Sequence, residues 1–251
     1  MITPLLSCCL LLVLGSCAPR ALVRQGWTPA QDPGLLLDQA RRDLDALRDL
    51  QASADLSLVR AGERQFASAA LLFKAPDLFR IEVRGPLFIH LFTALLQGDS
   101  LLVSAGDGAW RGGPFADELV TGLLGLDLSG YDLRYALLGL VAPAPLDSLS
   151  WPRAERCLAY LAGNPPRRLW LDTRRGFVAA EELLGPGGEV LLSRQLGDYR
   201  RVGDRYLPCR VELRQGPNAL VLEYRSWELD TGLRESAFTR GIPLDHLEPL
   251  E

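Results

Sequence analysis

Apolar and polar positions alternate along most of this chain, which is typical of β-strands that bury one face. Phe79, Ile81 and Val83, for example, alternate with charged residues. Turns that contain Gly, Pro or Asp separate the runs. Strands are predicted over residues 55–59, 65–74, 79–83, 87–97, 100–104, 109–111, 155–162, 168–172, 177–184, 190–199, 206–214 and 219–229. The pattern indicates about eleven or twelve antiparallel strands in one curved sheet.

Three segments have helical spacing instead. Apolar residues three and four positions apart predict an amphipathic helix over 35–50. Two shorter apolar helices are predicted over 114–126 and 133–140, with prolines after the second. The sheet is therefore expected to carry an N-terminal helix and one helical insertion.

The chain starts with an apolar run, 5–14, that ends in Leu14-Gly15-Ser16-Cys17. A run of this length is typical of a signal peptide and is too short to cross a bilayer, which takes roughly 20 apolar residues. The motif resembles the bacterial lipobox, in which a diacylglycerol joins the cysteine sulfur and cleavage makes the cysteine the first residue. Residues 1–4 contain no Lys or Arg, whereas the start of a signal peptide is usually basic. Two alternatives therefore remain: an ordinary secretory signal that contains a cysteine by chance, and a start of translation at another position.

These observations divide the chain into a signal peptide (1–16), a tether rich in Pro and Gly (17–34) and one domain (35–251). Residues are 48% hydrophobic and 23% charged, which suffices for a large core. The formal net charge is −4 and both signs are mixed along the chain. We therefore predict no nucleic-acid partner.

Candidate reactive groups are few. Once the signal is removed and Cys17 is lipidated, Cys157 and Cys209 remain, and the sequence leaves open whether they pair or are buried thiols. No His or Cys lies near either one, which disfavours a metal site. His90 and His246 are the only histidines, and no nucleophile elbow, Walker loop or dinucleotide fingerprint occurs. We predict no catalytic residue, no metal and no cofactor, and hence no enzyme.

The order of these segments resembles the LolA/LolB family of lipoprotein carriers and outer-membrane receptors, and is closer still to an uncharacterised LolA-like lipoprotein family. The resemblance covers most of 44–229. Local matches are Phe66 to Phe73, 77–83, Gly85-Pro86-Leu87-Phe88, 118–125, 137–139, 207–213 and 220–227. It implies a mainly β fold, a single incomplete antiparallel barrel of about 11 strands, with an N-terminal helix and short lid helices over an apolar cavity. Phe88 stands where LolB has Gly.

The resemblance also implies where lipids are handled. Leu87 and Phe88 are the candidate membrane contacts, because LolB exposes a leucine on a protruding loop there. The candidate cavity-lining residues are Phe66, Leu71, Phe73, Leu91, Phe92, Leu95, Leu119, Leu123, Leu137 and Leu138. The alternative for these ten residues is that they fill a closed core.

The function that follows is a lipid-anchored protein on the periplasmic face of the outer membrane, since Ala18 follows the cysteine. It would bind acyl chains or lipoproteins in an apolar cavity, for lipoprotein or lipid localisation. Expected partners are membrane lipid through acylated Cys17, the acyl or lipoprotein cargo, and a periplasmic carrier. The alternative is a docking or scaffold lipoprotein of an envelope complex that uses the same fold, which a filled cavity would favour.

Overall fold

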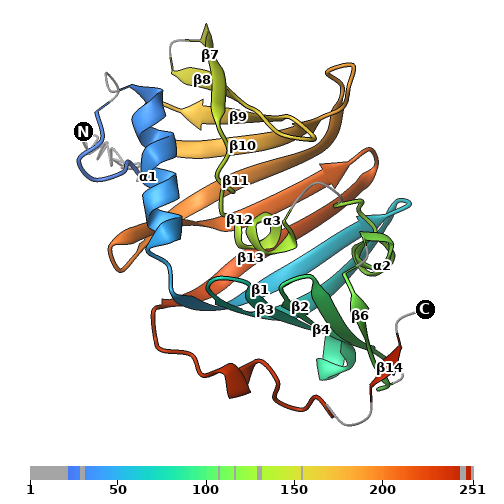
Figure 1. Cartoon of the computed structure of the whole chain (residues 1–251). Helices are drawn as coiled ribbons and strands as arrows, with labels where there is room; N and C mark the ends of the chain where they lie inside the picture. The colour runs from blue at the N-terminus through green and yellow to red at the C-terminus, as the bar shows by residue number, and fades with distance from the viewer. Residues whose placement is uncertain are drawn as a thin grey trace, which may run out of the picture.

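One curved sheet dominates the computed structural model (Figure 1). The structure describes residues 22–28, 32–106, 108–115, 117–128, 132–153, 155–243 and 247–249, without the side chains of 117–120. Its strands are β1 (Asp49–Arg60), β2 (Glu63–Lys74), β3 (Leu78–Arg84), β4 (His90–Gln97), β5 (Ser100–Ala105), β6 (Trp110–Pro114), β7 (Leu146–Arg153), β8 (Arg156–Leu161), β9 (Arg167–Asp172), β10 (Phe177–Leu184), β11 (Val190–Val202), β12 (Arg205–Gln215), β13 (Asn218–Leu229) and β14 (Glu248–Pro249). The helices are α1 (Pro33–Asp45), α2 (Asp117–Leu124), α3 (Leu133–Leu138) and the 3-10 turns η1 (Pro86–Phe88) and η2 (Glu235–Ala237).

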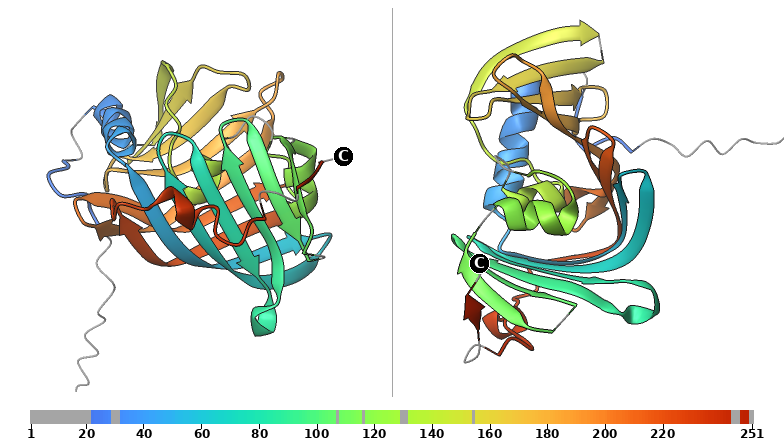
Figure 2. Two further views of the ribbon diagram at one scale, coloured as in Figure 1. Left: turned by 60° about the horizontal axis from the view of Figure 1, so that its bottom comes forward. Right: turned by 90° about the vertical axis from the view of Figure 1, so that its right-hand side faces the viewer.

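The sheet has the order β14-β6-β5-β4-β3-β2-β1-β13-β12-β11-β10-β9-β8-β7. All pairs are antiparallel except β14 with β6, and the two halves meet where β1 pairs with β13. The edges β14 and β7 do not pair with each other, so the barrel is incomplete. Figure 2 shows the sheet wrapped around α1, α2 and α3. The predicted mainly β, incomplete antiparallel barrel with an N-terminal helix and short lid helices is confirmed.

Two of the fourteen strands, β7 and β14, lie outside the twelve predicted ranges, which are based on period-two alternation. All residues of β7 are exposed, so this strand carries no alternation of buried and exposed positions. The strand β14 is only two residues long. The predicted strand 87–97 begins only at His90, because the chain first makes the 3-10 turn η1.

The main core lies on the concave face of the sheet. Alternate residues of the central strands are buried there, as the register of β1 with β2 places Leu50 opposite Phe73 and Ala52 opposite Leu71. Helix α3 supplies Leu137 and Leu138, which are almost fully buried. Its C-terminal Gly139 has φ +68°, and an added Cβ would lie 2.5 Å from Cγ of Pro208. A larger residue is thus excluded where α3 contacts β12.

The convex face is covered in part by the C-terminal segment, 233–242. Phe238 and Ile242 pack there against Leu95. The Arg80 guanidinium fastens this segment by donating to the carbonyl oxygens of Phe238 and Arg240, each at 2.7 Å. The covering segment explains why β2, β4 and β5 also carry apolar residues on the convex face, namely Leu72, Leu95 and Leu102.

Of the expected tether the structure describes 22–28 and 32–34, and 22–28 lies against the domain. Trp27 Nε1 donates to the Thr173 carbonyl at 2.7 Å, and Arg24 Nε donates to that of Gly176 at 3.0 Å. Helix α1 begins at Pro33, inside the expected tether, because Pro suits the first helical turn and the Asp32 side chain accepts from the Gly34 amide. The expected signal peptide and Cys17 lie outside the described residues.

Candidate membrane-contact and acyl-binding site

The turn between β3 and β4, residues 85–89, is called the apolar turn below. It is closed by a hydrogen bond from the Gly85 amide to the Ile89 carbonyl at 2.8 Å. Leu87 is 90% exposed, Phe88 81% and Ile89 60%. Figure 2 shows the turn projecting beyond the ends of the neighbouring strands. Both candidate membrane-contact residues, Leu87 and Phe88, therefore point away from the core.

The backbone of the apolar turn is strained. Leu87 has φ 58° and Phe88 has φ 61°, in the left-handed region that residues other than glycine rarely adopt. Each such residue costs roughly 1–2 kcal/mol. The rest of the fold compensates for this strain and keeps the side chains of Leu87 and Phe88 exposed to water. Backbone strain of this kind is typical of functional sites.

Most candidate lining residues lie on the concave face. Leu71, Phe73, Phe92, Leu137 and Leu138 are buried in the main core. Leu123 is half-buried and packs against them. The structure brings these six residues together around one apolar interior. Leu119 belongs to the part of α2 whose side chains the structure does not describe.

Two candidates, Phe66 and Leu95, lie on the convex face, contrary to the expectation that they line the cavity. Leu95 packs under the C-terminal segment, while Phe66 is 63% exposed. Leu91 is 44% exposed at a bulge of β4, where its Cδ2 would lie 3.4 Å from a Cβ added to the buried Gly85. The sequence could not separate the two sets because alternation identifies two faces without showing which one is concave.

In the described part of the chain, buried apolar side chains pack together on the concave side of the sheet. A void of about 50 Å³ remains between α1 and the sheet, lined by residues that include Leu36, Leu44, Leu140 and Leu207. This is room for a water molecule or two, far less than an acyl chain needs. A wider, polar groove of about 400 Å³ adjoins it beside Arg24 and Tyr206.

Buried charges fasten α3 to the sheet. Glu181 of β10 lies between Arg167 of β9 and Arg194 of β11, and Arg167 Nη1 contacts its carboxylate at 2.9 Å. Arg194 also donates to the carbonyl oxygens of Tyr135 at 2.6 Å and Leu140 at 2.8 Å. These carbonyls belong to the end of α3, where cations are favourable. We call Glu181, Arg167 and Arg194 the Glu181 network.

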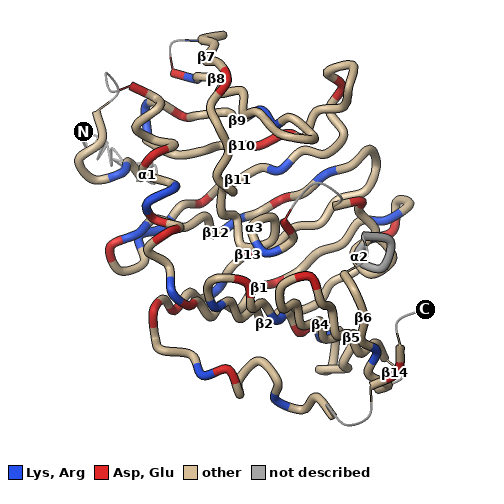
Figure 3. The backbone as a smooth tube through the Cα atoms, in the orientation of Figure 1, with Lys and Arg blue, Asp and Glu red and all other residues tan. Residues whose placement is uncertain are grey.

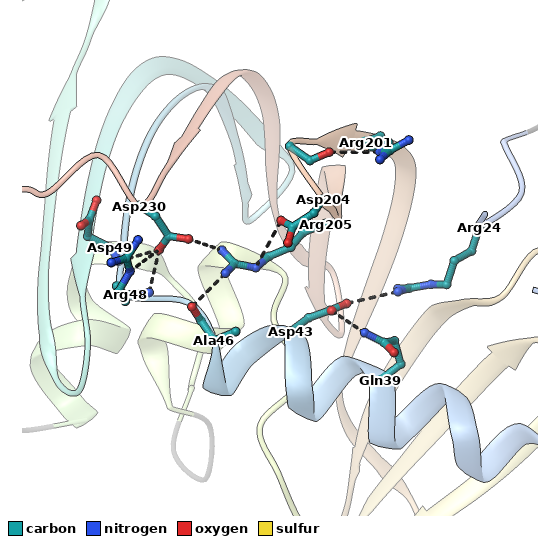
Figure 4. A network of polar contacts seen from close by, with 11 residues as sticks. Arg24, Gln39, Asp43, Ala46, Arg48, Asp49, Arg201, Asp204, Arg205 and Asp230 are labelled. Atoms are coloured by element: carbon teal, nitrogen blue, oxygen red, sulfur yellow. Dashed lines mark hydrogen bonds and ion pairs between the residues drawn. The ribbon is translucent and has the colours of Figure 1, made fainter. Parts of the chain in front are cut away.

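Polar contacts at the protein surface hold α1 (Figure 4). Arg24 pairs with Asp43 at 3.1 Å, and Arg205 donates to the Ala46 carbonyl and to Asp230, both at 2.8 Å. Burial disfavours the charged form of Asp230, but hydrogen bonds from the Arg48 amide and the Arg205 guanidinium outweigh it and lower the pKa of Asp230. Helix α1 therefore has partly exposed attachments, whereas those of α3 are buried.

The remaining reactive groups have structural surroundings. Cys157 and Cys209 are free and buried, and burial raises the pKa of each thiol. The ring Nε2 of His90 is 2.9 Å from the Thr93 hydroxyl, and His246 lies outside the described residues. In the described part of the chain no group of His, Cys, Asp or Glu could hold a metal ion.

Positively and negatively charged residues are mixed over the molecule rather than gathered on separate surfaces. Lys and Arg alternate with Asp and Glu along the backbone in Figure 3, and many form ion pairs between neighbouring strands, such as Arg168 with Glu182. The described helices include none that is both long and apolar enough to span a membrane.

Comparisons with known proteins show similarity in structure alone. No family model matches the chain, and no curated protein matches its sequence. A DUF1329 family protein from Desulfovibrio piger has 13% identity and a TM-score of 0.60, over 83% of this chain and 98% of that one. A LolA superfamily protein from Nitrosomonas europaea has 13% identity and a TM-score of 0.60, over 84% of this chain and 99% of that one. A putative outer membrane lipoprotein-sorting protein domain from Vibrio parahaemolyticus has 13% identity and a TM-score of 0.57, over 82% of this chain and 97% of that one. Together with the open sheet and its lid helices, these likenesses show that the chain has a LolA-like fold.

Proposed function

We propose that this protein is a lipid-anchored protein on the periplasmic face of the outer membrane that binds acyl chains or lipoproteins for their localisation. The observation that carries the proposal is the apolar turn, which holds Leu87 and Phe88 exposed in a strained backbone. Exposed apolar residues at a projecting turn suit contact with a membrane. The LolA-like fold supports the acyl-binding part, because it places an apolar interior beneath helices.

Access to that interior is expected beneath α1. The void lies between α1 and the sheet, and the attachments of α1 are partly exposed. Releasing α3 would instead deprive the buried Arg194 of its acceptors, the carbonyl oxygens of Tyr135 and Leu140, and leaving buried charged donors unsatisfied costs more than about 1–3 kcal/mol. An acyl chain would therefore displace α1 and leave α3 in place.

A fatty-acid analogue whose fluorescence depends on polarity tests this function, with the full chain carrying Cys17→Ala. We expect saturable binding that leaves the thermal transition intact. Ala40→Leu, in α1 at the void, should weaken binding several-fold because the larger side chain fills the space. Ala70→Leu, the same change at an exposed position of β2, is the matched control and should bind as the parent does.

The second candidate is the docking or scaffold lipoprotein. The filled interior favours it, since a void of about 50 Å³ holds no acyl chain without movement. Absence of saturable binding, together with a cooperative thermal transition, would reject acyl binding and leave the docking function.

Replacing Cys17 by Ala is expected to release the protein from membranes into the soluble fraction and to abolish acyl labelling. The reason is the motif that ends in Cys17 after an apolar run, because two or three acyl chains anchor a protein stably while none remains in the variant. Metabolic labelling with a palmitate analogue, followed by fractionation, measures both effects. Cys157→Ala serves as control and should keep the label. Full labelling of the Cys17 variant would contradict the anchor.

A further inference from the structure

Three hollows adjoin one another along α1. The void of about 50 Å³ shares Arg24 and Tyr206 with the polar groove of about 400 Å³. It shares Ala40 and Val141 with another groove of about 310 Å³, which lies between α1 and residues 141–146 and is called the second groove below. The two grooves are therefore joined beneath α1 by a path that is narrowest at the void.

The two ends of this path differ in chemistry. The second groove is lined mainly by apolar residues such as Leu37 and Leu161, with Asp38 and Arg41 beside them. The lining of the polar groove is richer in charged and hydrogen-bonding side chains, which include Arg24, Arg42, Asp43, Arg201, Asp204 and Tyr206. Polar groups at one end of an apolar site fix the orientation of a ligand. The path thus suits an amphiphile that has one polar end.

Two arginines of the polar groove have only neutral partners in the part of the chain that the structure describes. Arg42 of α1 donates to Gln39 Oε1 at 2.9 Å. Arg201 of β11 donates to the Gly203 carbonyl at 3.0 Å and to Gln25 Oε1 at 2.8 Å. Both side chains are exposed. Their positive charges are therefore available to an anion at the groove.

The two carboxylates of the polar groove leave this positive charge in place. Asp43 of α1 points toward Arg24 in Figure 4 and pairs with it at 3.1 Å. The Arg24 guanidinium also lies over the rings of Tyr206 and Phe177, 5.2 and 5.5 Å from their centroids, so it forms a fixed wall of the groove. The side chain of Asp204 is 88% exposed, and water and salt screen its charge.

The expected anchor brings a bilayer close to the polar groove. Seven residues lead from Cys17 to Arg24, and an extended chain of that length spans at most about 25 Å. With Cys17 acylated as proposed above, the groove therefore stays near the membrane surface. The anionic amphiphiles of a bilayer are phospholipids, and phosphate oxygens form strong charge-assisted hydrogen bonds with guanidinium groups.

We propose that the polar groove binds the phosphate of a phospholipid through Arg42 and Arg201, while an acyl chain of the same lipid passes beneath α1 toward the second groove. This inference rests on the acyl binding proposed above and narrows the cargo to lipids that carry phosphate. The phosphate stays at the exposed end of the path, so its charge is not buried, and only the acyl chain enters the interior.

Two single-chain lipids with the same fluorescent acyl chain test the headgroup site: lysophosphatidate, which carries a phosphate, and monoacylglycerol, which carries none. The full chain with Cys17→Ala should bind lysophosphatidate about tenfold more tightly, because the arginines donate charge-assisted hydrogen bonds to the phosphate. Arg42→Gln combined with Arg201→Gln should reduce this preference to about twofold or less. The preference is a ratio of two affinities on one protein, so a general loss of folded protein does not change it.

The matched control is Arg64→Gln combined with Arg156→Gln, which removes two exposed arginines from β2 and β8, away from the groove. It should keep the full preference. If the parent binds both lipids equally, or if the groove variant keeps the preference, the headgroup site is wrong and acyl binding stands. If neither lipid binds saturably, acyl binding itself fails.

Calorimetry with inorganic phosphate alone separates a lipid headgroup from free phosphate. We expect no binding in the micromolar range, because exposed arginines hold phosphate weakly when no acyl chain binds with it. Micromolar binding of inorganic phosphate that Arg42→Gln with Arg201→Gln abolishes would make free phosphate the ligand of the groove and would overturn the lipid assignment.

Discussion

Leu87→Glu combined with Phe88→Glu is expected to weaken vesicle binding of the unanchored protein about a hundredfold or more, with little change in melting temperature. Both side chains are almost fully exposed, so each substitution should alter the free energy of unfolding by no more than about 0.5 kcal/mol. Inserting a Leu or Phe side chain into lipid contributes about 1.5–3 kcal/mol to the binding free energy. The Glu that replaces it loses this contribution, and inserting its carboxylate would also cost the free energy of removing a charge from water.

Vesicle sedimentation and a thermal melt of the same variant separate the alternatives. The control is Val190→Glu with Leu191→Glu, because this pair is also apolar, adjacent and exposed, but lies on β11. We expect the control to bind vesicles as the parent does. A large fall in melting temperature would mean that the turn is packed in the protein. Unchanged binding at unchanged stability would mean that the turn is exposed but does not contact lipid.

The sequence predicts the strands well where alternation and turn residues agree. Phe79, Ile81 and Val83 alternate with charges and form β3. The prediction fails where the backbone departs from the regular pattern. Leu87 and Phe88 read as the start of a strand, yet they adopt positive φ and form a turn. Such a conformation depends on the neighbouring strands, and an apolar run in the sequence gives no signal of it.

The candidate site is harder to predict, because the faces of a strand are equivalent until the sheet curves. Leu71 and Leu95 look alike in sequence, but Leu71 lies in the main core and Leu95 under Phe238. The C-terminal segment that makes the difference contacts β4 from well over a hundred residues away along the chain. A contact between segments so far apart in the sequence is determined by tertiary packing, so the local pattern does not predict it.

The Glu181 network was also missed, since Arg167, Glu181 and Arg194 occur in strands where alternating charges usually face water. In the structure Glu181 and Arg194 are fully buried, and Arg194 donates to Glu181 and to the carbonyls at the end of α3. No sequence signal separates them from exposed pairs such as Arg210 with Glu223. Only the sheet's curvature around α3 places them inside.

Arg194→Met is expected to lower the free energy of unfolding by about 3–5 kcal/mol, because it removes one partner of a buried ion pair. For a chain of this size, that corresponds to a fall in melting temperature of roughly 6–20 °C. Glu181→Gln should cost at least as much, since Arg167 and Arg194 would then face each other without the carboxylate between them. Arg225→Met, at the exposed pair with Asp55, is the control and should shift stability by less than about 1 kcal/mol.

The same variant tests whether α3 is the fixed element over the interior. Without Arg194, the Leu140 carbonyl loses the Arg194 hydrogen bond and the Tyr135 carbonyl keeps only its backbone donors. Amide hydrogen exchange in α3 should therefore quicken while that in β1 and β2 stays slow. If acyl chains reach the interior beneath α1 with α3 in place, affinity for the fatty-acid analogue should change little at temperatures where the variant is folded. A marked gain in affinity would show instead that α3 is the barrier to entry, and the assignment of α1 as the moving helix would be wrong.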